Sequence, residues 1–372
     1  MAVVLEADTV GPCGCGAFSA SRRRLLGMSA TVALAGLSKA GYAQSASSAQ
    51  SPSPAASEVP AHRVDVHHHI LPPKYIAVAR DRLLSFAPNF ASVLNWTPAQ
   101  SLEQMDQFGI RTAMTSLSNP GTWFGNVAEA RTLARMANEY AAEMVRDHPG
   151  RFGMLASVSL PDVEGSLREI EYAFDVLKAD GIGLLTSYGD KWPGDDAFAP
   201  VFEELDRRNA TAYFHPTSAD CCSALIKDVP APAVEYMFDT TRAITSLLFT
   251  GSLSKYRNIN FMFSHAGGAT APIVQRIARL ATVDKKIAAR LPDGPLAEMK
   301  RLYFDTATST GPENLGAILQ LVGTDKILFG SDYPFLSVQA TLPGLLKFGF
   351  AADDLARIER GNALKLFPRL RT

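Results

Sequence analysis

Short apolar runs alternate with longer amphipathic segments from residue 62 to the end of the chain. The runs are rich in β-branched and aromatic residues, which favours β-strands over helices of the same length. The pattern therefore predicts eight strands, at residues 63–69, 111–118, 152–160, 181–188, 211–217, 258–267, 302–308 and 326–334.

The segments between these runs have the period of a helix. Residues 126–145 and 165–178 place apolar side chains at steps of three and four, as expected for helices that cover a sheet. Eight strands that alternate with helices over about 310 residues are typical of the α/β class, and here they predict a (β/α)₈ TIM barrel rather than an open sheet. We expect this barrel to occupy residues 62–372.

Composition and charge narrow the possible classes of protein. The chain has 372 residues, of which 47% are hydrophobic, so it can form a large core. Its 36 Lys and Arg balance 37 Asp and Glu, which argues against nucleic acid or an anionic membrane as a partner. Four cysteines without a repeated spacing exclude a disulfide scaffold and a thiolate zinc site.

The first 43 residues resemble a twin-arginine signal peptide. Three arginines at 22–24 precede a short apolar stretch at 28–37, and small residues at 41–43 suit a cleavage site. The apolar stretch is too short to span a bilayer, so we expect no membrane anchor. Residues 44–61 are small, polar and proline-rich, which predicts a disordered linker. An exported, periplasmic protein is expected; the alternative is a cytoplasmic protein with a basic tail.

Polar residues with possible chemistry lie near the ends of four predicted strands. These residues are His67 and His69, His215, His265, and Asp332. In a TIM barrel the active site is built at the C-terminal ends of the strands. Five such side chains from four strands therefore indicate one common site.

Three histidines and one aspartate are candidate metal ligands. His67 and His69 alternate along a strand and so share a face, whereas His68 points away from it. His215 would add a third imidazole and Asp332 a carboxylate, which completes a His₃Asp set for one divalent ion. The structural alternatives are a buried histidine at 215 and a turn cap at 332.

His265 is the candidate proton donor or acceptor beside the ion. It ends the sixth run and is followed by Ala-Gly-Gly, where glycines allow a close approach of the backbone to the site. The alternative is that His265 only supports its loop.

The segments VDVHHHILP, YFHP, FSHAGG, YFDTAT and ILFGSDYPF together resemble the amidohydrolase superfamily. Within it, residues 63–367 are similar to metal-dependent non-oxidative decarboxylases of the α-amino-β-carboxymuconate-semialdehyde and 6-methylsalicylate types. The resemblance implies metal ligation by the His₃Asp set and catalysis by His265 as acid or base. Two-metal barrels commonly carry a carbamylated lysine at the end of the fourth strand, and residues 181–188 contain no lysine. One metal per chain is expected, zinc or alternatively manganese.

Decarboxylation of a small aromatic or unsaturated carboxylic acid is the predicted reaction. The ion would hold and polarise the substrate carboxylate, and a proton would replace CO₂ on the ring carbon. Both His265 and Asp332 are candidate donors. The same residues suit a hydrolase of a lactone, ester or amide, and a non-catalytic exported binding protein is a third hypothesis.

Three further residues are predicted to contact the substrate. Arg242 carries a guanidinium that pairs well with a carboxylate, Trp123 follows the second strand on a rim loop, and Tyr188 ends the fourth run. Each has a structural alternative, as a surface arginine or as a packing residue. Residues 218–250 are long enough to form the interface of a homodimer.

Overall fold

The computed structural model describes residues 62–86, 88–223 and 225–371. The predicted signal peptide at 1–43 and the predicted linker at 44–61 lie outside the described residues. In the part of the chain that is described, none of the helices combines the length and apolar character that crossing a membrane would require.

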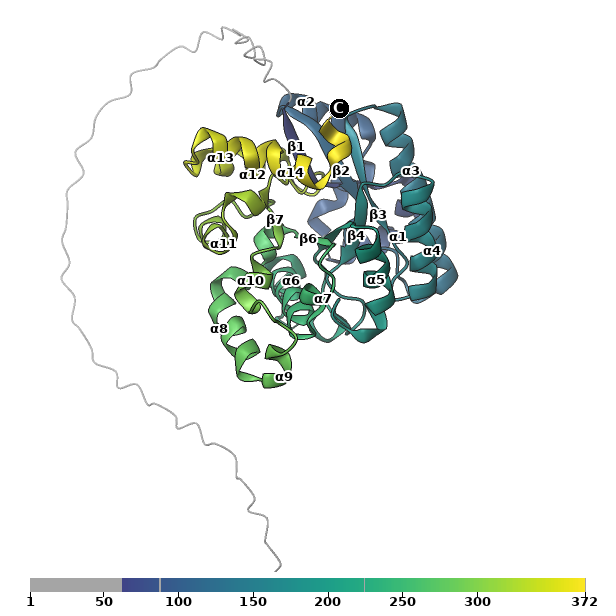
Figure 1. The fold of residues 1–372 in the computed structure, drawn as a ribbon. Helices are drawn as coiled ribbons and strands as arrows, with labels where there is room; N and C mark the ends of the chain where they lie inside the picture. The colour runs from purple at the N-terminus through teal and green to yellow at the C-terminus, as the bar shows by residue number, and fades with distance from the viewer. Residues whose placement is uncertain (1–61, 87, 224, 372) are drawn as a thin grey trace, which may run out of the picture. The chain divides into compact units, whose positions relative to one another are not determined.

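Eight parallel strands form one sheet in which each strand pairs with the next along the chain. This arrangement confirms the predicted (β/α)₈ barrel (Figure 1). The strands are β1 (Arg63–His69), β2 (Ile110–Ser116), β3 (Phe152–Ser157), β4 (Gly181–Leu185), β5 (Thr211–His215), β6 (Asn260–Phe263), β7 (Tyr303–Asp305) and β8 (Ile327–Leu328).

The chain after β8 closes the barrel against β1. The backbone N–H of Val66 donates to the carbonyl oxygen of Phe329 at 2.9 Å, and that of His69 donates to Tyr333 at 2.7 Å. These bonds place the segment after β8 directly beside the HHH triplet of β1.

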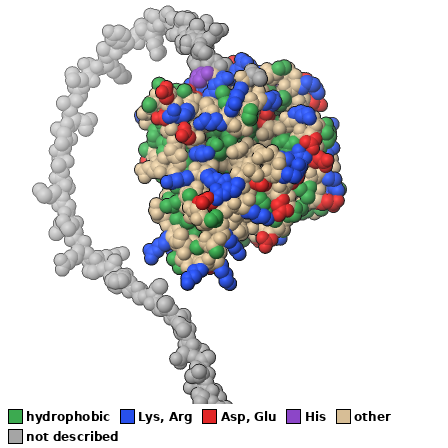
Figure 2. All heavy atoms as spheres, in the orientation of Figure 1, with side chains coloured by type: hydrophobic (Ala, Val, Ile, Leu, Met, Phe, Trp, Pro, Cys, Tyr) green, Lys and Arg blue, Asp and Glu red, His purple; other side chains and the backbone are tan. Residues whose placement is uncertain are grey.

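Helices surround the strands, as Figure 1 shows. In the same orientation, Figure 2 shows both basic and acidic side chains on the visible face of the described residues. The helices are α1 (Pro73–Phe86), α2 (Pro98–Gln107), α3 (Val127–Asp147), α4 (Val163–Asp175), α5 (Ala199–Arg207), α6 (Ala231–Phe249), α7 (Ser252–Lys255), α8 (Thr270–Val283), α9 (Lys285–Ala288), α10 (Pro295–Met299), α11 (Leu315–Val322), α12 (Val338–Lys347), α13 (Ala352–Ala356) and α14 (Asn362–Leu366). The predicted helices at 126–145 and 165–178 correspond to α3 and α4. Asn126 caps α3 by accepting from the N–H of Glu129.

The C-terminal segment covers the end of the barrel where strands begin. Phe367 packs in a buried cluster with Met114 and Tyr213 of the strands. At the same end, Arg63 at the start of β1 pairs with Glu359 at 2.7 Å, which is a buried ion pair. The opposite end, where the strands finish, is therefore the end at which side chains are available for a site.

Candidate metal centre

The four predicted metal ligands lie together at the C-terminal ends of the strands. His67 and His69 come from β1, His215 ends β5, and Asp332 belongs to the loop after β8. One ligand atom from each lies within 4.8 Å of the others. The histidines are buried, and the Asp332 side chain is 14% exposed. The fold thus gathers residues separated by up to 265 positions around one point.

The distances between the ligand atoms suit a single ion. His67 Nε2 and His69 Nε2 are 2.9 Å apart, and each lies 3.2 Å from Asp332 Oδ1. Two ligands that each bind a metal at about 2.1 Å, at tetrahedral or octahedral angles, are roughly 3.0–3.4 Å apart. Three imidazole nitrogens and a carboxylate oxygen are also a donor set that borderline divalent ions accept.

Hydrogen bonds on the far side of each imidazole leave its Nε2 atom free to bind. His67 Nδ1 donates to Asp305 Oδ2 at 2.9 Å, and His215 Nδ1 donates to the carbonyl oxygen of Pro216 at 2.9 Å. His69 Nδ1 lies 3.2 Å from the hydroxyl oxygen of Ser116. A ring nitrogen that donates to an oxygen must carry the proton, so the lone pair for a metal is on Nε2.

The charges of the surrounding side chains favour a positive charge between the four candidate ligands. Burial lowers the pKa of His67, but the Asp305 and Asp332 carboxylates outweigh it and raise that pKa to about 10. Burial lowers the pKa of His69 to about 4. Burial raises the pKa of Asp332, yet the neighbouring His67 holds it well below its usual value. A metal ion that binds here therefore meets the ionised carboxylate of Asp332 and the neutral ring of His69, and it displaces the proton that the two carboxylates hold on His67.

Asp305, at the end of β7, links the metal ligands to the candidate proton donor. Its Oδ1 accepts from the N–H of His265 at 2.9 Å, while its Oδ2 accepts from His67. The side chain is 1% exposed. Asp305 has no role among the predicted site residues, because it lies in the middle of the predicted run 302–308 and becomes a strand end only in the folded barrel.

Two residues of the site hold an uncommon backbone conformation. Asp332 has φ of 69° and His265 has φ of 52°. Such left-handed conformations cost of order 1–3 kcal/mol in a residue other than glycine, and they persist only where surrounding contacts enforce them. Two contacts hold Asp332 in this conformation. The hydroxyl of its neighbour Ser331 donates to buried Asp65 at 2.6 Å, and the backbone N–H of Asp332 donates to the His67 carbonyl at 2.9 Å.

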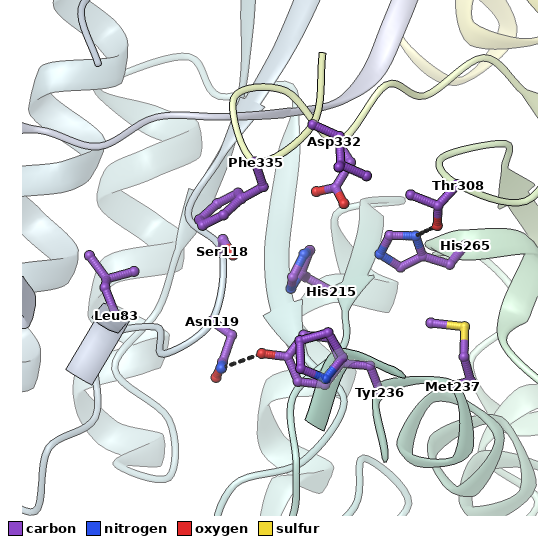
Figure 3. A pocket seen from close by; sticks show the side chains of 12 residues that line it. Leu83, Ser118, Asn119, His215, Tyr236, Met237, His265, Thr308, Asp332 and Phe335 are labelled. Carbon is purple, nitrogen blue, oxygen red and sulfur yellow. Dashed lines mark hydrogen bonds between the residues drawn. The ribbon is translucent and has the colours of Figure 1, made fainter. Parts of the chain in front are cut away.

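His265 presents one ring nitrogen to a cavity beside the ligands. Its Nδ1 lies 3.0 Å from the Ala307 carbonyl oxygen and 2.9 Å from Thr308 Oγ1. The ring's other nitrogen, Nε2, faces the interior of the cavity, where Asp332 and His215 also point (Figure 3). Burial lowers the pKa of His265 below its usual value, so the ring is neutral near pH 7.

The cavity has a volume of about 260 Å³. Three of the predicted site residues line it, together with apolar side chains and four polar ones, Ser118, Asn119, Tyr236 and Thr308 (Figure 3). The lining residues are Leu83, Ser118, Asn119, His215, Pro232, Tyr236, Met237, His265, Thr308, Asp332, Phe335 and Leu336. Asn119 and Tyr236 carried no signal in the sequence that would have distinguished them from other loop and helix residues.

The predicted substrate contacts Arg242, Tyr188 and Trp123 are not among these lining residues. Arg242 and Tyr236 share α6, but they are six positions apart and so face different sides of the helix. Arg242 Nη1 lies 3.9 Å from Glu235, and the residue lines a separate surface hollow.

Tyr188 and Trp123 also lie outside the group of residues that line the cavity. The Tyr188 ring packs edge-on against Phe198 with centroids 5.7 Å apart, and its hydroxyl accepts from the N–H of Leu185 at 2.9 Å. Trp123 is half-buried in the loop after β2. Neither residue lines the cavity. A position at a strand end or on a rim loop does not by itself direct a side chain toward the cavity.

Replacing Asp305 by asparagine is expected to weaken metal binding by about 10- to 100-fold without unfolding the protein. The substitution places an amide where His67 Nδ1–H now meets a carboxylate, so it disturbs the tautomer that leaves Nε2 free. Metal titration of the purified variant measures this effect. Asp293→Asn is a matched control, because Asp293 is an exposed carboxylate paired with Arg257. Equal metal affinity in Asp305→Asn and the wild type would contradict the prediction.

Comparison with known proteins identifies the family of this chain. The model of the amidohydrolase family matches residues 64–369. The decarboxylase yanB of Aspergillus niger is 35% identical over 326 residues, which cover 82% of this chain and 88% of that protein. The 6-methylsalicylic acid decarboxylase of Penicillium expansum is 33% identical over 316 residues, which cover 83% of this chain and 97% of that protein.

Solved structures show the same fold. A structure described as an amidohydrolase II is 26% identical, with a TM-score of 0.74 over 82% of this chain and 99% of that one. A dihydroxybenzoic acid decarboxylase from Polaromonas sp. JS666, solved with bound manganese and the inhibitor 2-nitroresorcinol, is 22% identical. It has a TM-score of 0.73 over 83% of this chain and 98% of that one. The family match, the identity to the curated relatives and the barrel establish that this chain belongs to the amidohydrolase family.

Proposed function

We infer that this protein is a metal-dependent decarboxylase of a small aromatic carboxylic acid, a carboxy-lyase. The observation that carries the inference is the gathering of the His₃Asp set beside a cavity of about 260 Å³ that is lined by His215, His265 and Asp332. This volume suits a single substituted ring. Two curated relatives at 33–35% identity are named decarboxylases, one of them for 6-methylsalicylic acid, which supports the same reaction.

His265 is the residue that we propose as the proton donor to the ring carbon. When bound, the ion supplies a Lewis acid that fixes and polarises the substrate carboxylate. Loss of CO₂ then requires a proton at the carbon that carried this group. The pKa of Asp332 is held well below its usual value, so its carboxyl group carries almost no proton to give. His265 has an Nε2 atom facing the cavity. Because the ring is neutral near pH 7, Nε2 first takes up a proton from solvent and then passes it to the ring carbon, and the lowered pKa favours this transfer.

The identity of the ion is proposed as manganese or zinc, one ion per chain. The imidazole-rich donor set suits zinc, the ion expected first from the sequence. Bound manganese in the structure of the Polaromonas decarboxylase supports the second candidate. Elemental analysis of the purified protein, followed by removal of the ion and addition of each metal in turn, identifies the one that restores activity.

A screen for CO₂ release tests the proposed reaction. The metal-loaded protein is expected to release CO₂ from one or more hydroxybenzoates and to yield the ring with hydrogen in place of the carboxyl group. The same preparation is offered aryl esters and lactones, with acid release as the readout. Acid release without CO₂ would make the protein a hydrolase, and it would overturn the proposal.

Export through a twin-arginine pathway is proposed for the full-length chain, on the basis of residues 1–43. Cleavage is expected after Ala43, so that the mature protein begins at Gln44. N-terminal sequencing of the protein recovered from the periplasm of an expressing bacterium measures the cleavage site. Recovery of the uncleaved chain from the cytoplasm alone would argue for the basic-tail alternative.

A homodimer that uses residues 218–250 is proposed as the assembled form. Within this range, Phe238 of α6 is 45% exposed, and it lies beside Ile273 and Leu280 of α8 in one surface hollow. Light scattering on the purified chain measures its mass in solution.

A further inference from the structure

A pair of polar residues stands in the cavity apart from the metal ligands. The amide nitrogen of Asn119, in the loop after β2, donates to the hydroxyl oxygen of Tyr236 on α6 at 2.7 Å (Figure 3). The Asn119 carbonyl oxygen accepts from Thr217 Oγ1 at 2.7 Å, and the N–H of Thr217 donates to Thr186 Oγ1 at 3.0 Å. These bonds hold Asn119 with its amide N–H toward Tyr236.

This arrangement leaves the proton of the Tyr236 hydroxyl available. Because Asn119 is the donor in their hydrogen bond, Tyr236 uses a lone pair there and not its own O–H. Among the described residues, no side chain or backbone group accepts from this O–H at hydrogen-bonding distance. A phenol that lines a cavity usually satisfies its proton with a partner. Burial also raises the pKa of Tyr236, so the hydroxyl keeps its proton at any pH of interest.

The charges around the cavity limit what the partner can be. None of the described residues that line it is a lysine or an arginine. Asp332 lines it, and the buried carboxylate of Asp305 lies next to His67 behind it. The two positive charges of a divalent ion are offset by these carboxylates. A substrate carboxylate bound at the ion therefore finds no further cation that could neutralise a second anionic group.

We propose that Tyr236, held by Asn119, determines substrate specificity by donating a hydrogen bond to a ring hydroxyl of the substrate, and that the cavity accepts a ring with a single carboxylate. This proposal rests on the proposed function and assigns a residue to the selection of its substrate. The rest of the ring would lie against the apolar wall formed by Leu83, Phe335 and Leu336. An alkyl group on the ring is compatible with that wall, whereas a second carboxylate is not.

The test compares dissociation constants of simple ring acids for the metal-loaded protein. The probes are benzoate, the three monohydroxybenzoates and isophthalate. Binding is followed by tryptophan fluorescence. A hydroxybenzoate that the protein decarboxylates is compared by its kcat/KM instead. The wild type is expected to bind one hydroxybenzoate about 10-fold more tightly than benzoate, and to bind isophthalate at least about 10-fold more weakly than benzoate. Tyr236→Phe is expected to abolish the preference for the hydroxybenzoate while its affinity for benzoate and its metal content stay the same.

Two further variants sharpen the result. Tyr256→Phe removes a buried hydroxyl outside the cavity, whose bond to Ala199 is long at 3.5 Å, and it is expected to leave every affinity unchanged. Thr217→Val removes the donor that orients Asn119, and it is expected to reduce the same preference as Tyr236→Phe.

Specific outcomes would overturn the proposal. One is a Tyr236→Phe variant that loses affinity equally for benzoate and the hydroxybenzoates, and another is a Tyr236→Phe variant that keeps the wild-type preference for the hydroxybenzoate. Wild-type protein that binds isophthalate as tightly as benzoate would contradict the limit to a single carboxylate. These dissociation constants do not depend on turnover. Absence of CO₂ release would therefore count against the proposed function and leave this test valid.

Discussion

Replacing His67 by alanine is expected to abolish metal binding and, with it, decarboxylation. His67 provides one of three imidazole nitrogens and lies within 3.2 Å of both His69 Nε2 and Asp332 Oδ1. Its loss also leaves the buried carboxylate of Asp305 without its histidine partner. We expect metal content to fall from one ion per chain to almost none, and kcat/KM to fall by at least about 10³-fold, since metal polarisation is worth several kcal/mol of transition-state stabilisation.

The adjacent residue is a control for this variant. His68 lies on the same strand, but its Nε2 contacts Ser101 Oγ at 2.8 Å and its Nδ1 contacts Asp65 Oδ2 at 3.1 Å, away from the ligands. His68→Gln keeps a polar side chain there and is expected to retain the ion, with a modest loss of stability. Elemental analysis and CO₂ release are measured on both proteins. Full metal content in His67→Ala, or equal loss in the two variants, would contradict the assignment of His67 as a ligand.

Replacing His265 by asparagine is expected to remove activity while the ion stays bound. A positioned acid or base typically contributes 10²- to 10⁴-fold to the rate, so kcat is expected to fall by about that factor. Asparagine is the suitable replacement because His265 has φ of 52°, a conformation that asparagine tolerates better than most residues. The backbone N–H that donates to Asp305 is retained in this variant.

Three measurements separate a catalytic role for His265 from a structural one. Metal content, the midpoint of urea unfolding and the dissociation constant for benzoate are all expected to remain close to wild type, while CO₂ release falls. A protein that loses the ion together with activity would show that His265 acts through Asp305 on the ligands. Unchanged activity would exclude His265 as the proton donor and direct attention to Asp332.

The residues in both predictions could be identified from the sequence, whereas the residue that links them could not. The pattern of residues shows His67 and His69 alternating along one strand, and it places His215, His265 and Asp332 at or near strand ends. A TIM barrel brings the C-terminal ends of all its strands to one rim, so these residues were expected to meet. Asp305 lies inside the predicted run 302–308, and its role as an acceptor for both His67 and His265 depends on contacts across 238 and 40 positions of the chain.

The sequence by itself determined the eight strands, their order around the barrel and the residues that could bind an ion, because hydrophobic periodicity is a local property and the barrel rule converts strand ends into a site. The predicted runs extended past the observed strands, for example to residue 267 where β6 ends at Phe263. Those last residues leave the sheet to form the rim, and only tertiary contacts make them do so.

Only the tertiary structure decided which other side chains reach the cavity. Tyr236 and Arg242 are six residues apart on α6, and nothing in the local sequence distinguishes the face of that helix that meets the cavity from the face that meets solvent. In the structure, Tyr236, Pro232 and Met237 line the cavity, and Arg242 lies outside it. Helix rotation is set by packing against the whole barrel, which is why the metal ligands could be predicted from sequence and the substrate contacts could not.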